Sequence, residues 1–163
     1  MADSVRIRDY RSSDADDVNR IAVTAFGQFR DHYRDWPAML AGLSRTSSLS
    51  DTGELIVAET NERVAGAVAY FGPIAAKASF FDPAWPIIRM LVVDPVDRGK
   101  GLGHALTSEC LARAKRDRSA IIALHTSPIM TVALPMYLKL GFTKAHDAPP
   151  IFGMPYAVYT KAL

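Results

Sequence analysis

Residues 88–103 combine an apolar run, a proline stop and a basic, glycine-rich turn within one short segment. The apolar run ends before Pro95, where the proline interrupts regular strand pairing. The turn that follows carries Gly99, Gly101 and Gly103 in front of a helix-forming stretch. Glycines allow backbone N–H groups to crowd around one anion, and the positive end of the helix adds to the attraction. The segment therefore predicts a phosphate or pyrophosphate site at the end of a strand.

The spacing of the glycines distinguishes between the known kinds of phosphate loop. A Walker loop needs serine or threonine at the position where this sequence has Gly101. A dinucleotide-binding fingerprint needs a third glycine where the sequence has His104 or Leu106. The pattern that fits is Arg-x-x-Gly-x-Gly, formed by Arg98, Gly101 and Gly103. The spacing therefore excludes the Walker loop and the dinucleotide-binding loop and indicates another kind of phosphate loop.

That pattern, placed after an apolar strand ending in Val-Asp-Pro, resembles the acyl-CoA pyrophosphate loop of the GCN5-related N-acetyltransferase (GNAT) family. A second motif supports the resemblance independently, because Tyr137 precedes Gly141 and Phe142 as in the last core helix of that family. A strand at 5–8 and a helix at 14–25 extend the resemblance over essentially the whole chain. The two motifs occur in the order that the family requires.

The resemblance implies an α+β fold. Its sheet is mixed, mostly antiparallel and twisted, with helices on both faces and a splay between the two central parallel strands. It implies one acetyl-CoA-dependent N-acetyltransferase domain over residues 1–163. Such an enzyme moves the acetyl group of acetyl-CoA to a primary amine of a small molecule, peptide or protein by direct attack in a ternary complex. Two alternatives stay open, namely transfer of a longer acyl group and a non-catalytic acyl-CoA-binding or sensing module.

The resemblance also assigns residues to the donor site, and it implies no metal ligand. Backbone N–H groups of the apolar strand are expected to contact the pantetheine arm and the thioester carbonyl, and the glycine-rich turn is expected to hold the pyrophosphate. The predicted donor-binding residues are Leu91, Val92, Val93, Arg98, Gly99, Lys100, Gly101, Leu102, Gly103 and His104.

Tyr137 is the predicted catalytic residue. A phenol with an ordinary pKa of about 10 is protonated at neutral pH and can give its proton to a sulfur leaving group. The competing interpretation is an aromatic side chain at a helix end that packs against Leu140 and Phe142.

The general base cannot be identified from the sequence, and one donor contact departs from the family pattern. Many members have an asparagine seven residues before the tyrosine, where this chain has Met130. The groups that could accept the amine proton are His125, Glu59, Glu54, His32 and Asp82. A histidine that ends a buried strand is more often structural than catalytic, and a water chain to bulk solvent would also serve.

Hydrophobic periodicity and turn signals predict the remaining elements. Strands are expected over 5–10, 54–60, 63–71, 87–93, 119–125 and 156–161, and helices over 14–25, 102–116 and 128–140. A further helical region over 26–43 is interrupted by Pro37, Ser13 is the expected N-cap of the first helix, and Pro135 is expected to kink the last helix or mark its late start. The long segment 72–86 is expected to cover a site.

Composition limits the class of protein. With 49% hydrophobic and 22% charged residues the chain is neither disordered nor membrane-like, and its net charge of +2 is too small to indicate nucleic-acid binding. Cys110 is the one cysteine and residues 1–4 show no secretory signal, which together favour a cytoplasmic protein. The expected partners are acetyl-CoA and an amine acceptor, and a homodimer is one assembly that the sequence leaves open.

Charge is divided unevenly along the chain. Residues 1–62 carry 7 Lys/Arg and 11 Asp/Glu, whereas residues 63–163 carry 12 and 6. A basic second half suits an anionic donor such as CoA. The acidic first half suits either a cationic acceptor or an ordinary solvated surface.

Overall fold

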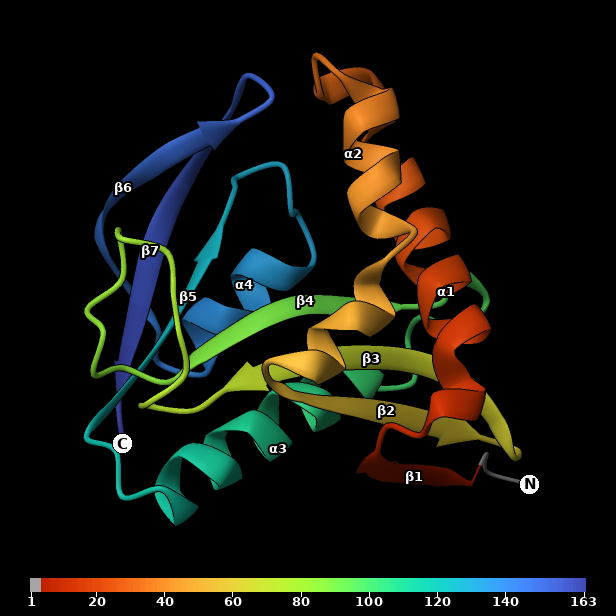
Figure 1. The fold of residues 1–163 in the computed structure, drawn as a ribbon, viewed down its shortest axis with the longest axis horizontal. Helices are drawn as coiled ribbons and strands as arrows, with labels where there is room; N and C mark the ends of the chain where they lie inside the picture. The colour runs from red at the N-terminus through yellow and green to blue at the C-terminus, as the bar shows by residue number, and fades with distance from the viewer. Residues whose placement is uncertain (1–3) are drawn as a thin grey trace.

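The computed structural model describes residues 4–163, which form one seven-stranded sheet with helices on both of its faces (Figure 1). The strands are β1 (Val5–Asp9), β2 (Glu54–Thr60), β3 (Arg63–Phe71), β4 (Ile87–Val93), β5 (Ile121–Thr126), β6 (Thr143–Ile151) and β7 (Met154–Ala162). The helices are α1 (Ala15–Gly27), α2 (Trp36–Leu43), α3 (Leu102–Arg116) and α4 (Ala133–Lys139). Residues 1–3, on which the expectation about a signal segment partly rests, lie outside the described residues. No helix within residues 4–163 is both long enough and apolar enough to cross a bilayer.

The sheet is mixed and its two halves part in the middle. Its order is β1-β2-β3-β4-β5-β7-β6, and every neighbouring pair is antiparallel except β4–β5. The parallel pairing of β4 with β5 is confined to Ile87 and Ala123, after which the strands diverge (Figure 1). Met90 has a φ of 56°, and the register with β3 shifts between Ala67 and Ala69. The predicted α+β class and the splay between the central strands are confirmed.

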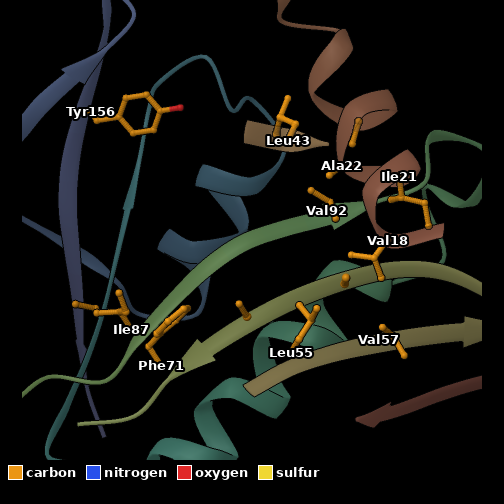
Figure 2. Packing of buried hydrophobic residues seen from close by; sticks show 14 of the residues in the cluster. Val18, Ile21, Ala22, Leu43, Leu55, Val57, Phe71, Ile87, Val92 and Tyr156 are labelled. Carbon is orange, nitrogen blue, oxygen red and sulfur yellow. The ribbon is translucent and has the colours of Figure 1, made fainter. Parts of the chain in front are cut away.

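Alternation along the central strands divides the core into two faces. On β2, Leu55 and Val57 belong to one cluster, whereas Ile56 and Ala58 belong to the other. Helices α1 and α2 cover the first face, and Figure 2 shows α1 and Leu43 of α2 packed over β2, β3 and β4. Helices α3 and α4 contribute to the second face. The first-face cluster also includes Tyr156 of β7, which lies on the same face as α1 but toward the other edge of the sheet.

The structure departs from the sequence predictions in several places. Strand β6 was not predicted, and the expected helical region 26–43 is divided between the end of α1 and the separate helix α2, which has Pro37 in its first turn. The last core helix starts at Ala133 rather than at residue 128, so that Pro135 falls in its first turn, where a missing N–H costs little. Ser13 is not the N-cap of α1. It lies in a short 3-10 turn, and Asp14 occupies the N-cap position. The Asp14 carboxylate accepts hydrogen bonds from the Arg8 guanidinium and from the Arg11 backbone N–H instead.

The segment 72–86 is folded back on itself by Lys77. Its ammonium group donates to the carbonyl oxygens of Gly72 and Ala75, both at 2.8 Å, and to two further carbonyls of the segment at 3.3 Å. Burial lowers the pKa of Lys77. The rings of Phe80 and Phe81 then pack against the imidazole of His125 on β5. The segment therefore packs onto the first face of the sheet, where Phe81 is part of the buried cluster.

A glycine is required at position 66, where β3 pairs closely with β4. A Cβ at this position would lie 2.9 Å from the Val92 carbonyl oxygen and 3.2 Å from Leu106 Cδ1. Because a backbone oxygen in a central strand cannot move aside, we expect Gly66→Ala to lower the free energy of unfolding by about 1–3 kcal/mol. The matched control is Gly42→Ala on α2, where no atom lies within 4 Å of the added Cβ. It should be neutral or stabilise by up to about 1 kcal/mol. Urea unfolding of both variants measures the difference, and equal midpoints would contradict this account.

Candidate functional site

A cavity of about 550 Å³ opens where the end of β4, the glycine-rich turn and the start of α4 meet. Its walls include all the predicted donor-binding residues except Lys100, namely Leu91, Val92, Val93, Arg98, Gly99, Gly101, Leu102, Gly103 and His104. The remaining wall comes from Asp97, from the end of α1 and from the segment that precedes and begins α4. The structure therefore brings the sequence-predicted strand and turn together around one volume of ligand size.

The start of α3 borders this cavity with its backbone. Gly101 is the N-cap residue with a φ of 77°, a left-handed conformation that glycine adopts without strain, and no described side chain caps the helix. A Cβ on Gly103 would meet Met136 Sδ at 3.8 Å and side-chain atoms of Leu91 and Val93 at 3.9 Å. The first-turn amides are thus left to a ligand at the positive end of the helix dipole.

Two buried aspartates hold the turn in place. Asp97 accepts both Arg63 guanidinium nitrogens at 2.8 Å and the Lys100 ammonium at 3.0 Å. Asp94 accepts from the Val96 backbone N–H and from Arg20 of α1, each at 3.2 Å. Both carboxylates are buried. The turn is therefore tied to β3 and α1 by ion pairs.

Lys100 is bound to Asp97, a residue that itself lines the cavity. Its ammonium pairs with Asp97, and Lys100 is not among the cavity's lining residues. Arg98 has the opposite placement, because its exposed side chain lines the cavity and makes no ion pair with any described residue. Among the predicted cations, Arg98 is therefore the one that is placed to meet a ligand phosphate. His104 is exposed on the same wall.

The apolar part of the wall combines distant segments. Met130 lines the cavity at the position where many family members have asparagine, so this chain offers a thioether there instead of an amide. Phe26 and Phe29, at the end of α1, line the opposite part. A pantetheine arm, which is mostly apolar, would contact these side chains favourably.

Tyr137 lies beside this cavity but does not line it. Its neighbour Met136 is on the wall, whereas the Tyr137 side chain is buried in the second-face core with its ring edge-on to Phe142 at 5.7 Å. Burial raises its pKa well above the ordinary value. Its hydroxyl makes no hydrogen bond with a described residue.

The candidate bases are spread over the molecule. Glu59 pairs with Arg8 at 2.6 Å, and Arg116 holds Glu54 and lowers its pKa. His32 follows α1 and Asp82 accepts from the Ala84 N–H within its own segment. None of these four lines the cavity. His125, the fifth candidate, lies on β5 among aromatic rings and does not line the cavity either.

Comparison with known proteins decides the family. Residues 51–144, more than half of the chain, match the family model of the acetyltransferase (GNAT) domain. The chain belongs to the GNAT family. The match includes β4, the glycine-rich turn and α3, as well as Tyr137. No curated protein sequence matches the chain.

Solved structures agree on the fold. A GCN5-related N-acetyltransferase from Rhodopseudomonas palustris superposes with a TM-score of 0.77 at 20% identity, over 100% of this chain and 99% of that one. The protein PH1933 from Pyrococcus horikoshii gives 0.78 at 14% identity, over 98% and 99%. The protein yncA from Salmonella typhimurium, determined with its cofactor acetyl-CoA, gives 0.67 at 20% identity, over 98% and 94%. At these identities the likeness concerns the GNAT fold alone.

Sequence reasoning did not find the ion pairs that hold the turn. Arg63 and Asp97 are 34 positions apart, and Arg20 and Asp94 are 74 apart. No local pattern relates such residues, because only the folded sheet brings them together. The Asp94-Pro95 dipeptide was the one available signal, since an aspartate before a proline favours a turn.

We expect Asp97→Asn to weaken the fold in a pH-dependent way. Ion pairing, first with Arg63 and also with Lys100, lowers the pKa of Asp97. Its stabilisation is therefore complete above the unfolded-state pKa of roughly 3.9 and is lost as pH falls through the lower folded-state pKa. At pH 7 the variant should lose about 1–2 kcal/mol of unfolding free energy, a modest figure because Arg63 is 46% exposed.

Denaturant unfolding at neutral and acid pH measures this effect. The wild-type advantage over Asp97→Asn should shrink below about pH 4. Asp147→Asn is the control, because Asp147 pairs with Lys144 on the surface and is 84% exposed, and it should behave like wild type at each pH. A wild-type advantage that does not change with pH would contradict the assignment.

Proposed function

We propose that this protein is an acetyl-CoA-dependent N-acetyltransferase that acetylates a primary amine by direct attack in a ternary complex. The observation that carries the proposal is the cavity in which the apolar end of β4 meets the uncapped start of α3. One half of this volume suits an apolar arm and the other half suits phosphates. The family match and a neighbour determined with acetyl-CoA support the choice of donor.

The donor's phosphates would be bound by the turn and by α3. The backbone at Gly101 and Gly103 lets the pyrophosphate approach the first-turn amides, whose partial positive charge is not used by a capping side chain. Arg98 would add a formal charge from the same wall. Lys100 has a second role in this proposal, since its ion pair with Asp97 keeps the turn in shape.

The thioester would lie along the β5-facing edge of β4. Pairing with β5 is confined to Ile87, whereas Val92 and Val93 pair with β3 on the other edge. Backbone groups of residues 91–93 on the open edge therefore have no strand partner there and can bind a ligand instead. An N–H on this edge can donate to the thioester oxygen as it becomes negative during attack.

In the reaction, the neutral amine nitrogen forms the new C–N bond, the C–S bond breaks and CoA leaves as a thiol. We assign the proton on sulfur to Tyr137, whose buried phenol is protonated at neutral pH and whose hydroxyl has no partner among the described residues. The amine proton leaves to a base or to solvent. The protein's main contribution is to align the two substrates.

The proposal also includes the number of domains and the cellular compartment of the protein. Residues 1–163 would form one domain, since one sheet carries both core faces and the cavity. The one cysteine, Cys110, is buried, and burial raises the pKa of its thiol to about 12. It is therefore inert in the reaction and fits a protein of the reducing cytoplasm.

The experiment that tests the proposal follows thiol release from acetyl-CoA with a panel of amines. Steady release that depends on the amine, with an N-acetyl product seen by mass spectrometry, would establish an acetyltransferase. Tight donor binding without release from any amine would instead favour the binding module, and faster release from longer acyl-CoAs would change the assigned donor.

Gly103→Asp should remove donor binding without harming the fold. The added Cβ would make only ordinary contacts, and a carboxylate in the first turn of α3 suits the helix dipole. The same carboxylate would enter the cavity and repel the donor's phosphates. We expect at least a roughly hundredfold weaker affinity for acetyl-CoA by calorimetry, since a like charge in an anion site costs several kcal/mol. The control is Gly42→Asp on α2, which adds the same charge in open space and should keep wild-type affinity. Equal affinities for Gly103→Asp and wild type would refute the placement of the donor.

Tyr137→Phe tests the proton donor. The ring keeps its edge-on contact with Phe142, so the melting temperature should change little. If the phenol protonates the sulfur, kcat should fall by up to about 10²-fold while donor affinity stays the same. Tyr10→Phe, which removes a hydroxyl beyond the end of β1, is the control. Unchanged turnover in Tyr137→Phe, with chemistry rate-limiting, would leave Tyr137 a structural residue.

A further inference from the structure

Arg89 is a cation on the central strand that the donor site does not use. It lies on β4, on the face that α1 and α2 cover, and its guanidinium stands over the Phe71 ring at 5.4 Å. Its neighbours Ile87 and Val92 on that face are buried, yet Arg89 is exposed. The sheet is therefore open to solvent at this one position of its central strand.

No carboxylate satisfies this guanidinium. Arg89 makes no hydrogen bond or ion pair with a described residue, although most arginines on this sheet and its helices do. The protein around it lowers its pKa by desolvation, without a compensating acidic neighbour. An arginine in such a setting is well suited to bind an external anion, because its planar fork fits a carboxylate with two parallel hydrogen bonds.

The surroundings of Arg89 are aromatic. On β5, His125 lies among the rings of Phe80, Phe81 and Tyr156, with centroid separations of 5.2, 5.7 and 5.3 Å. Burial and the positive charge of Arg89 lower the pKa of His125 to about 4, so that the imidazole is neutral at pH 7. Its Nδ1 is buried without a partner. Arg89 therefore faces an aromatic wall that carries one unpaired polar atom.

This aromatic wall is closed on its outer side by the connection between α1 and α2. The Tyr33 hydroxyl shares a 2.5 Å hydrogen bond with the Tyr156 hydroxyl, and the Arg34 backbone N–H donates to the Phe152 carbonyl at the β6–β7 turn. Figure 2 shows the Tyr156 ring directed from β7 toward the side where α1 and α2 lie. The surroundings of Arg89 are thus a built part of the first face rather than a chance feature of the surface.

Position on β4 relates Arg89 to the proposed chemistry. It precedes Leu91 by two residues, so that their backbones are at most about 7 Å apart. Leu91 begins the segment proposed to hold the thioester. A group bound by Arg89 would therefore lie within one small molecule's length of the carbonyl that is attacked.

We propose that Arg89 binds a carboxylate of the acceptor, and that the acceptors are small amines with a carboxylate and an apolar or aromatic side chain, such as free amino acids. This rests on the proposed acetyl transfer and specifies its substrate class. The guanidinium orients the acceptor, and the partly exposed ring of Phe80 contacts its apolar part. Peptide and protein amines, which have no carboxylate close to the amine, are disfavoured by the same arrangement.

Matched acceptor pairs test the proposal. Phenylalanine, tryptophan, leucine and methionine are each compared with their amides, which keep the amine and the side chain but lose the negative charge. Binding to the full chain is measured by calorimetry with and without CoA, and acetylation by thiol release. We expect at least one acid to bind more than tenfold tighter than its amide and to be acetylated with a correspondingly higher kcat/KM.

Arg89→Met should remove this preference, while the thioether keeps contact with Phe71 and donor affinity is unchanged. Arg89→Lys should restore it in part, because it keeps the charge but not the fork. Arg6→Met on β1, an edge strand separated from β4 by two others, removes the same charge and should keep the preference.

The outcomes separate this proposal from the one on which it rests. Equal binding of acids and amides, absence of binding by any pair, or a preference that survives in Arg89→Met would overturn the role of Arg89. Thiol release with amides or peptides but not with acids would do so too, while supporting acetyl transfer. Arg89-dependent binding of acids without thiol release would support the carboxylate site and refute the transferase.

Discussion

The parting of β4 and β5 is the constraint on which the rest of this structure depends. A parallel pair at the centre of a sheet would ordinarily be hydrogen-bonded along its length, but here the pairing is confined to Ile87 and Ala123. The positive φ of Met90 and the shifted register with β3 turn β4 away from its neighbour. Backbone groups that a sheet would normally use internally are thereby left for a ligand.

Electrostatics then fixes the loop that borders the opening. Asp97 is 1% exposed and binds Arg63 and Lys100, and Asp94 ties the same turn to Arg20 of α1. A glycine-rich turn alone would be mobile, because glycine gives up much conformational freedom on ordering. The ion pairs hold the turn while its glycines keep the backbone accessible. Cations and glycines thus have separate tasks, and Arg98 is the cation left for the ligand.

The proposed chemistry depends on two neighbouring parts of the structure. The cavity at the start of α3 suits the anionic donor, whereas Arg89, Phe71 and the aromatic wall around His125 lie on the face covered by α1 and α2. Arg89 is exposed although its neighbours on the strand are buried, and its guanidinium has no ion-pair partner among the described residues. Binding an acceptor carboxylate would supply that partner, which gives a physical reason for Arg89 on this strand.

The sequence by itself determined the strand–turn–helix unit, the family and the fold class, because these depend on local patterns: an apolar run, a proline stop, spaced glycines and Tyr137 before Gly141. The bounds of β4 and α3 were predictable for the same reason. Only the tertiary structure decided that Lys100 turns to Asp97, that Tyr137 lies behind the cavity wall, and that Arg89 stands unpaired on an open part of the sheet. Those outcomes depend on which distant side chains meet across the strands, and no periodicity along one chain segment carries that information.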